Sequence, residues 1–306
     1  MKKIISCAVL LFGITIFYGE MIMEAKSAYL GSELPGVKAK MFAPAVLKSD
    51  FDDYGATFSP DGKEMFFTRR DSAGIDKIMR IDLTKGQDAR PEPVSFTGIY
   101  LDFEPHIMFD GKSMLYGSVR RPAGAEANAQ PEMHWYCAER TKEGWAEPKL
   151  LNVPFNDRFI MYVTVARSKT MYFTGMEPGT KQDQSGLYYS TYEKGVYTEP
   201  VRMDASINGG AMTAHPFIAL DESYLLFDSI RAGGKGQADI YICFKEKDGT
   251  WSKPINLGID VNTGAKEMFP SVTPDGKYLF FGSTRRGKLH IYWSDFQALI
   301  KKLRAK

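Results

Sequence analysis

Phe269-Pro-Ser-Val-Thr-Pro-Asp-Gly-Lys-Tyr-Leu-Phe-Phe281 is one of five related stretches in this chain of 306 residues. Each stretch has an apolar run, a short polar turn and an aromatic-rich run. The five turns lie at 58–63, 107–112, 164–169, 218–223 and 272–277. The turn residues taken as equivalent are Asp61, Asp110, Arg167, Asp221 and Asp275. Self-similarity at roughly 40–50 residues is typical of propeller blades or a solenoid.

The turns themselves predict β-hairpins. Asp-Gly between two apolar runs is a strong hairpin signal, because a type I′ turn needs positive φ at both central residues. The third and fourth copies lack the glycine. We therefore expect longer turns, or turns of another type, in those two copies.

Each copy continues with a second and a third run that read as strands, and the first four copies add a fourth. The second strands are expected at 65–68, 114–117, 171–174, 224–227 and 278–281, and the third at 77–81, 134–137, 187–190, 239–242 and 290–293. Fourth, proline-bearing strands are expected at 93–96, 145–150, 197–201 and 251–255. Proline is tolerated at a sheet edge, so this strand is the outer one. Four antiparallel strands per unit predict an all-β, single five-bladed β-propeller, with six blades as the alternative.

The fifth unit lacks its fourth strand, and the segment 41–47, which carries Pro44, offers a spare one. We expect this N-terminal strand to complete the last blade and close the ring. A short C-terminal helix follows the fifth unit, with Ser294 and Gln297 at capping-box spacing. The apolar face of this helix comprises Phe296, Leu299, Ile300 and Leu303.

Several motifs resemble those of one known repeat. The relevant stretches are 233–241, 256–258, 262–263, 267–270, 274–277 and 283–285. They resemble the TolB-type, WD-like propeller repeat of exported bacterial proteins, from about Met41 to the C-terminus. The resemblance implies the fold; it implies little about function, because this repeat serves many different proteins. TolB also carries an α/β domain ahead of its propeller, for which this chain has no room, so a role in the Tol–Pal system is not implied.

The N-terminus reads as an export signal. Lys2 and Lys3 precede the apolar run 4–18, and small residues end the segment at Ser27. We expect a signal peptide over 1–27, a linker over 28–40, the propeller over 41–306, and a periplasmic or secreted protein. An uncleaved anchor is the alternative. Lipidation of Cys7 is not expected, because too few apolar residues precede it.

Composition limits the classes of partner that this chain is expected to bind. The formal net charge is +2, without the concentrated basic face that nucleic-acid binding needs. Cys137 and Cys243 fall two blades apart and are expected to be unpaired thiols. We expect no cofactor, no membrane span after signal cleavage, and a monomer.

The candidate site residues are those that the repeat brings to the axis. Eight positions before the turn residue stand Asp53, Asp102, Phe159, Thr213 and Glu267. Arginines follow the second strands, at Arg70, Arg120, Arg231 and Arg285. These acids and arginines are expected to have one of two roles. In the first, each arginine binds an acid or a loop carbonyl and so stabilises the edge of its blade. In the second, the acids and arginines form a ring of mixed charge that binds an anionic or sugar ligand. Glu104, His106 and His215 also lie on innermost strands, which makes a divalent metal site a further alternative.

Two functions remain open from the sequence. The first is a non-enzymatic binding module for a protein or glycan of the cell envelope, with Asp53, Asp102, Glu104, His106, His215 and Glu267 at one mouth of the channel. The second is a glycosidase or metal-dependent polysaccharide lyase at the same mouth. A deep polar funnel with converging carboxylates would favour the enzyme, and a plugged channel would favour the binding module.

Overall fold

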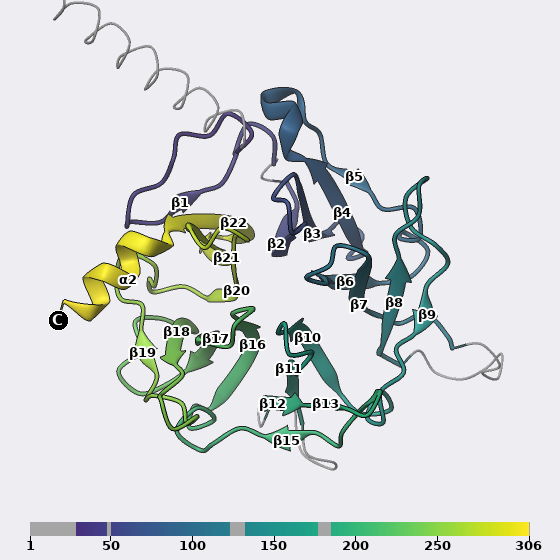
Figure 1. The fold of residues 1–306 in the computed structure, drawn as a ribbon. Helices are drawn as coiled ribbons and strands as arrows, with labels where there is room; N and C mark the ends of the chain where they lie inside the picture. Colours follow the sequence, from purple (N-terminus) through teal and green to yellow (C-terminus); the bar gives the residue numbers. More distant parts are fainter. Residues whose placement is uncertain (1–28, 48–49, 123–131, 177–184, 306) are drawn as a thin grey trace, which may run out of the picture.

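The computed structural model describes residues 29–47, 50–122, 132–176 and 185–305 and confirms the five-bladed propeller (Figure 1). Blade one comprises β2 (Asp52–Phe58), β3 (Glu64–Arg70), β4 (Asp76–Asp82) and β5 (Glu92–Pro93). Blade two comprises β6 (Asp102–Ile107), β7 (Ser113–Ser118), β8 (His134–Glu139) and β9 (Lys149–Leu150). Blade three comprises β10 (Ile160–Val165), β11 (Met171–Gly175), β12 (Gly186–Ser190) and β15 (Val201–Arg202). Blade four comprises β16 (Met212–Ile218), β17 (Tyr224–Ile230), β18 (Asp239–Phe244) and β19 (Ile255–Asn256). The innermost strands β2, β6, β10, β16 and, in blade five, β20 (Glu267–Val272) gather around one axis (Figure 1).

Two small elements are additional to the four-stranded pattern of the blades. A 3-10 helix, η1 (Leu83–Asp88), follows β4, and the hairpin of β13 (Tyr192–Glu193) and β14 (Val196–Tyr197) lies between the last two strands of blade three.

The ring closes through the N-terminal segment, as the sequence predicts. Blade five consists of β20 (Glu267–Val272), β21 (Tyr278–Arg286) and β22 (Lys288–Asp295), with β1 (Lys40–Met41) as its outer strand. Lys40 pairs with Trp293 and Met41 with Tyr292. The strand predicted over 41–47 is therefore shorter and begins one residue earlier. The chain turns after Phe42, where the Val46 N–H donates to the Ala43 carbonyl at 2.9 Å.

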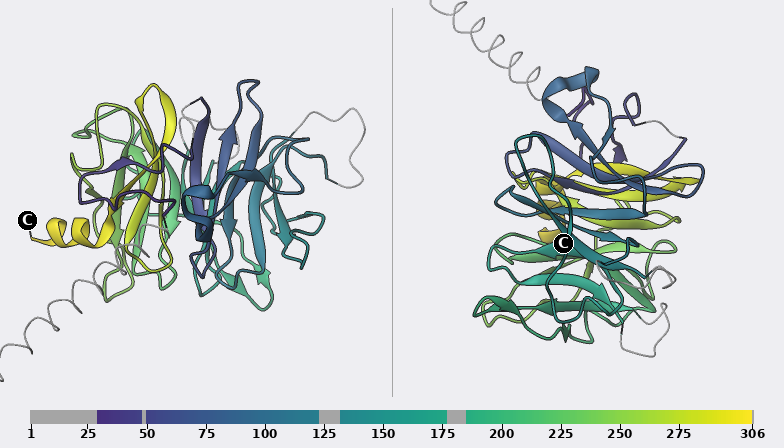
Figure 2. Two further views of the ribbon diagram at one scale, coloured as in Figure 1. Left: turned by 90° about the horizontal axis from the view of Figure 1, so that it is seen from above. Right: turned by 90° about the vertical axis from the view of Figure 1, so that its right-hand side faces the viewer.

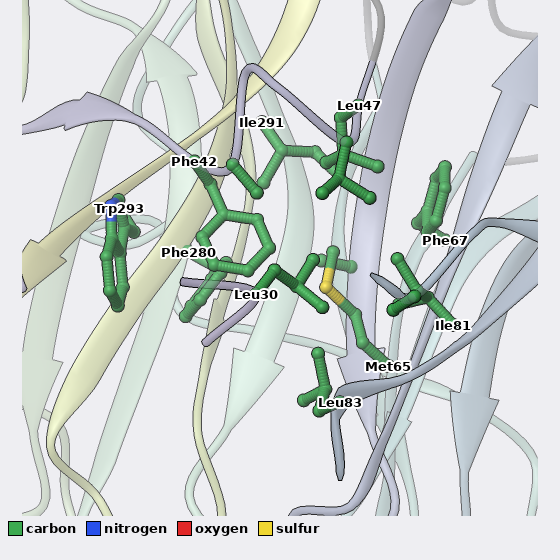
Figure 3. Close-up of a cluster of buried hydrophobic side chains, with 14 of the residues drawn as sticks. Leu30, Phe42, Leu47, Met65, Phe67, Ile81, Leu83, Phe280, Ile291 and Trp293 are labelled. Atoms are coloured by element: carbon green, nitrogen blue, oxygen red, sulfur yellow. The ribbon is translucent and has the colours of Figure 1, made fainter. Parts of the chain in front are cut away.

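A buried apolar cluster lies beneath this closing strand (Figure 3). The Phe42 side chain is 1% exposed. Its ring centroid lies 4.9 Å from that of Phe280 and 5.2 Å from that of Trp293. Leu30 and Met65 complete the contact between the N-terminal segment and blades one and five. Part of the expected linker thus packs into the core of the propeller.

The C-terminal helix α2 (Phe296–Arg304) forms where expected but begins differently. Its N-cap is Asp295, whose carboxylate accepts from the Ala298 N–H at 2.9 Å, so the predicted cap at Ser294 is wrong. The Ser294 hydroxyl instead donates to the Val37 carbonyl at 2.6 Å. Figure 2 shows that α2 lies outside the ring. Within the described part of the chain, no helix combines the length and apolar character needed to cross a membrane.

The hairpin turns correct the type I′ prediction. In blade one the Gly62 N–H donates to the Ser59 carbonyl at 2.8 Å, and Gly62 has φ +69° while Asp61 has negative φ. This is a type I turn followed by a left-handed residue. Glu222 takes the left-handed position in blade four, with φ +58°, so that turn is of the same type without a glycine.

Blade three has a shorter turn, and this changes the alignment of its copy. The Ala166 N–H donates to the Thr170 carbonyl, whereas the equivalent bond in blade one spans one residue more, from Ser59 to Glu64. Lys169 takes the left-handed position with φ +69°. The residue equivalent to the aspartates is therefore Ser168 rather than Arg167.

The two cysteines described, Cys137 and Cys243, are unpaired as predicted. Cys243 is buried and Cys137 is half-buried. The predicted signal peptide and Cys7 lie outside the described residues.

Candidate functional site

All five innermost strands carry a β-bulge at the same place. In every blade, the register between the innermost strand and the second strand shifts once, which marks the bulge. The residues in the bulges all have positive φ and are Gly55, Glu104, Tyr162, His215 and Phe269. A bulge re-aims the side chain of the strand that carries it. With the blade-three alignment corrected, each bulge residue stands six positions before its turn residue.

Aromatic side chains from these bulges fill the axis. Tyr162 and Phe269 lie with ring centroids 5.8 Å apart, and Tyr54 lies 4.8 Å from Phe269. His215 lies 4.0 Å from Phe269. The Tyr162 hydroxyl donates to the Pro270 carbonyl at 2.9 Å across the ring. These four residues with Glu104, called the plug below, are all buried, so they close the central channel at this level.

Ionisable groups in the plug and beside it hold backbone groups of the bulges. The Glu104 carboxylate accepts from the Tyr162 N–H at 2.7 Å. The Asp228 carboxylate accepts from the Phe269 N–H at 3.1 Å and lies 2.7 Å from Nδ1 of His215. Two further polar atoms, Asp228 Oδ2 and His215 Nε2, have no hydrogen-bond partner among the described residues. These contacts indicate a structural role.

Burial controls the protonation of this group. It raises the pKa of Glu104 to about 7, against a lowering by His215 and the Tyr162 N–H. It also raises the pKa of Asp228, although His215 opposes this. Burial alone would lower the pKa of His215, but the Asp228 carboxylate, with a smaller effect of Glu104, raises it overall.

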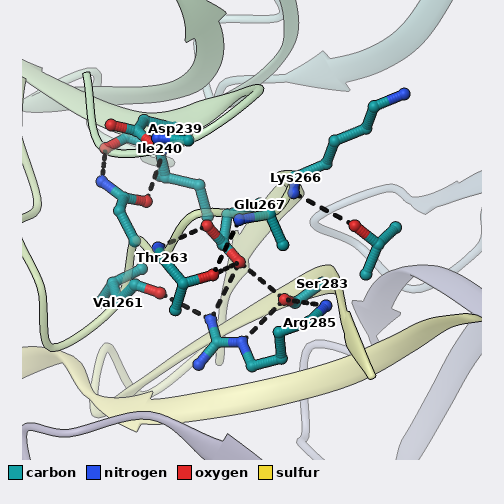
Figure 4. A network of polar contacts seen from close by, with 12 residues as sticks. Asp239, Ile240, Val261, Thr263, Lys266, Glu267, Ser283 and Arg285 are labelled. Carbon is teal, nitrogen blue, oxygen red and sulfur yellow. Dashed lines mark hydrogen bonds and ion pairs between the residues drawn. The ribbon is translucent and has the colours of Figure 1, made fainter. Parts of the chain in front are cut away.

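Two acids at the N-terminal ends of the inner strands are held by arginines of the same blade. Asp102 accepts from the Arg120 guanidinium at 3.1 Å, and the same arginine donates to the Phe96 carbonyl at 3.0 Å. Glu267 accepts from Arg285 at 3.2 Å, and Arg285 also donates to the Val261 carbonyl at 2.7 Å (Figure 4). Both acids are fully buried, so their charges interact with groups inside the blade rather than with solvent.

Blade one follows the same plan with a different arginine. Arg69, not Arg70, forms the two-fold contact with Asp53, at 2.7 Å for both bonds. Arg70 instead pairs with Asp76 of the neighbouring strand. The alternation of side chains along β3 explains this, because successive residues point to opposite faces.

Blades four and three lack the acid. In blade four the Thr213 hydroxyl lies 2.9 Å from that of Ser229, and Arg231 donates to the Ser206 and Ile207 carbonyls. In blade three the equivalent position is Ile160, opposite Gly175, rather than Phe159. The one-residue difference follows from the shorter turn.

A cavity of about 440 Å³ opens at the other end of the inner strands, where the hairpin turns lie. We call it the funnel. Equivalent turn residues of the five blades form its rim, namely Pro60, Phe109, Arg167, Leu220 and Pro274. Its floor consists of residues two positions after the bulges, namely Thr57, His106, Phe217 and Ser271. Apolar side chains including Ile107, Val165, Ile218 and Val272 form the wall.

Two polar side chains at the floor have unused hydrogen-bonding capacity. The Ser271 hydroxyl is buried, with the residue 3% exposed, and has no hydrogen-bond partner in the part of the chain that the structure describes. Nε2 of His106 accepts from the Val165 N–H at 3.2 Å, which leaves the proton on Nδ1. Burial lowers the pKa of His106 to about 4, so the ring is neutral at physiological pH. At the rim, the Arg167 guanidinium lies 5.9 Å from the Phe109 ring centroid.

The structure separates the six residues that the sequence places at one mouth. Glu104 and His215 belong to the plug, and Asp53, Asp102 and Glu267 belong to ion pairs at the N-terminal ends of the strands. His106 lines the funnel. In the described parts of the chain, no three His, Cys, Asp or Glu side chains are grouped so as to hold a metal ion.

The remaining funnel residues were missed by the sequence reasoning. The repeat itself held a signal for them. Once the turns are aligned on Ser168, the rim residues fall one position before the turn residue in every copy. The floor residues fall four positions before it. What the repeat could not reveal was the bulge, which decides that these side chains face the axis.

Comparison with known proteins shows which solved structures have a similar fold. No protein-family model matches the chain, and no curated protein matches it. Among solved structures, TolB from Acinetobacter baumannii is 15% identical with a TM-score of 0.52. The alignment covers 83% of this chain and 54% of TolB, so this chain spans about half of that protein's length.

Two glycosidases are similar to a comparable degree. The α-L-arabinofuranosidase from Lactobacillus brevis is 16% identical with a TM-score of 0.51, covering 83% of this chain and 92% of that enzyme. The catalytic domain of the GH62 α-L-arabinofuranosidase from Coprinopsis cinerea is 10% identical with a TM-score of 0.51, covering 85% and 97%. At such identities the likeness shows the propeller fold alone, which agrees with the TolB-type resemblance of the repeat.

Proposed function

We propose that this chain is an exported, non-enzymatic binding module, and that the funnel receives part of a protein or glycan partner of the cell envelope. The observation that carries the proposal is the closed axis. Because the plug blocks the channel, the funnel is open at one end and has room for an inserted group but not for a threaded chain. Its floor carries the unpartnered Ser271 hydroxyl, which a ligand could satisfy.

The rim supports binding to a partner's apolar surface. Four of its five residues, Pro60, Phe109, Leu220 and Pro274, are apolar, and Leu220 is 38% exposed. Apolar side chains around a concave pocket are typical of binding sites, with a few polar groups that set orientation. Equivalent positions of five blades supply this rim, so the blade framework fixes its shape.

Hydrolysis, the activity named for the two arabinofuranosidases, has less support. It requires two carboxyl groups flanking the bond, one with a raised pKa. The funnel's carboxyls are Asp221 and Asp275, both exposed at the turns. Hydrogen bonding from Ser223 lowers the pKa of Asp221. Burial works in the opposite direction for Asp275, but hydrogen bonds from Thr273 and Lys277 lower its pKa overall.

A pair of matched substitutions tests the proposal. The mature protein and two variants, Leu220→Glu at the rim and Ile259→Glu away from the funnel, would be used to capture partners from an envelope extract of the source organism. Ile259 is 74% exposed and does not line the funnel. We expect Leu220→Glu to weaken binding of the captured partner at least about tenfold, because a carboxylate would be buried in an apolar contact.

The control should bind as the parent protein does. Equal affinity of all three proteins for the captured partner would contradict the proposed site. Release of sugar from aryl glycosides by the parent protein, abolished by Asp221→Asn, would replace the proposal by the enzymatic alternative. Export is tested separately, because N-terminal sequencing of the protein from its host should begin near Ala28.

A further inference from the structure

The floor of the funnel is uneven around its axis. Three polar residues, Ser271, Thr57 and His106, come from blades five, one and two, which are consecutive around the ring. Phe217 of blade four lies across from them. The fifth equivalent residue, Thr164, is buried away from the cavity, and its hydroxyl donates to the Pro216 carbonyl at 2.8 Å. The floor therefore has a polar arc on one side and an aromatic ring on the other.

The polar arc can both donate and accept. Nothing in the described structure bonds to the buried Ser271 hydroxyl, so it can take either role once its side chain turns toward the cavity. His106 offers an Nδ1–H, since Nε2 is already used by the Val165 N–H. Both groups are uncharged, so they suit a neutral polar group better than a desolvated carboxylate or ammonium.

The wall and the rim limit where a ligand can be polar. Above the floor the cavity is surrounded by Ile107, Val165, Ile218 and Val272, and then by the rim, in which Arg167 is the one charged residue among four apolar ones. A sugar ring carries hydroxyls around its whole perimeter, and those facing this wall would lose their hydrogen bonds to water without replacement. A group with an apolar body and one polar atom at its tip would satisfy the polar arc without that loss.

Resting on the proposed function, we propose that the funnel recognises the side chain of a tyrosine presented by a protein partner, with its hydroxyl at the polar arc. The ring packs against Phe217, and the hydroxyl accepts from the Nδ1–H of His106 and bonds to Ser271. A cavity of about 440 Å³ holds one such side chain with part of its flanking backbone. The flanking backbone then lies against Pro60, Leu220 and Pro274.

The test measures binding of N-acetyl-tyrosinamide, N-acetyl-phenylalaninamide and a methyl arabinofuranoside to the mature protein by NMR titration. We expect the tyrosine probe to bind about five- to tenfold more tightly than the phenylalanine probe, which is the net gain when bonds of the hydroxyl to water are replaced by bonds to the polar arc. Ser271→Ala should reduce that preference, because the Nδ1–H of His106 can still bond to the hydroxyl, and should leave affinity for the phenylalanine probe unchanged. Ser95→Ala, a matched change at an exposed serine away from the funnel, should alter neither.

Phe217→Ala should weaken both amino-acid probes, and cooperative melting curves confirm that each variant is folded. Equal affinity for the two amino-acid probes, tighter binding of the sugar, or no binding of the tyrosine probe up to its solubility limit would each overturn the tyrosine assignment. The proposed function fails independently, if Leu220→Glu leaves binding of the captured partner intact. If Leu220→Glu abolishes binding of the partner but the protein shows no preference for the tyrosine probe, the funnel remains the binding site and the tyrosine assignment is rejected.

Discussion

Replacing Phe42 by alanine removes the largest fully buried side chain of the closing segment. The Phe42 side chain is 1% exposed and packs edge-on against Phe280 and Trp293. Loss of a buried phenylalanine costs about 3–5 kcal/mol, counting the transfer of the ring and the cavity left behind. Because a domain of this kind is stable by about 5–15 kcal/mol, this is a large part of the total. The expected fall in melting temperature is roughly 6–20 °C.

Urea unfolding followed by tryptophan fluorescence measures the loss, and amide hydrogen exchange locates it. Phe155→Ala removes an equally buried ring from the connection between blades two and three and serves as the matched control. Both variants should be destabilised, but only Phe42→Ala should speed exchange at Trp293 and Tyr292, which pair with β1. A loss below about 1 kcal/mol for Phe42→Ala, within the usual range for surface changes, would refute closure by this segment.

Three further predictions concern charges and thiols. Asp102→Ala should lower the free energy of unfolding by about 3–5 kcal/mol in urea titrations, because it leaves the guanidinium of Arg120 buried and unpaired; a loss comparable to that of an exposed aspartate would contradict this. Burial raises the pKa of Glu104 to about 7 from an ordinary 4.5, so the folded state binds more protons between these values and stability should fall as pH rises from 4.5 to 7. Glu104→Gln should flatten that fall, and an unchanged pH profile of the melting temperature would argue against it. Thiol titration of denatured, unreduced mature protein should find both Cys137 and Cys243, and missing thiols would indicate a bridge.

Much of the fold could be predicted because each copy of the repeat carries the same local signals. Turn residues, aromatic second strands and edge prolines all point to one blade, so the errors of one copy are corrected by the others. The missing fourth strand of blade five likewise identified the closing segment. Its length was overestimated because Pro44 was read as an edge-strand proline, whereas the chain turns after Phe42.

The candidate site was harder, for two physical reasons. The bulges put a residue of positive φ into every inner strand, and Glu104 and His215 carry no sequence sign of that conformation. The bulge turns these side chains into the plug rather than toward a mouth. The single-residue contraction of the blade-three turn also shifted the alignment from Ser168 to Arg167, which concealed the rim. Ion pairing of the acids was foreseen as an alternative, but the choice of Arg69 over Arg70 depends on strand alternation.

The most direct test of the binding account is amide hydrogen exchange of the mature protein with and without its captured partner. If the partner binds in the funnel, the hairpin turns should be protected, in segments 58–62, 107–111, 218–222 and 272–276. Exchange should not change at the N-terminal ends of the inner strands, in segments 96–101 and 257–266, where the arginine ion pairs lie. Protection confined to those opposite loops, with the turns unaffected, would contradict the account.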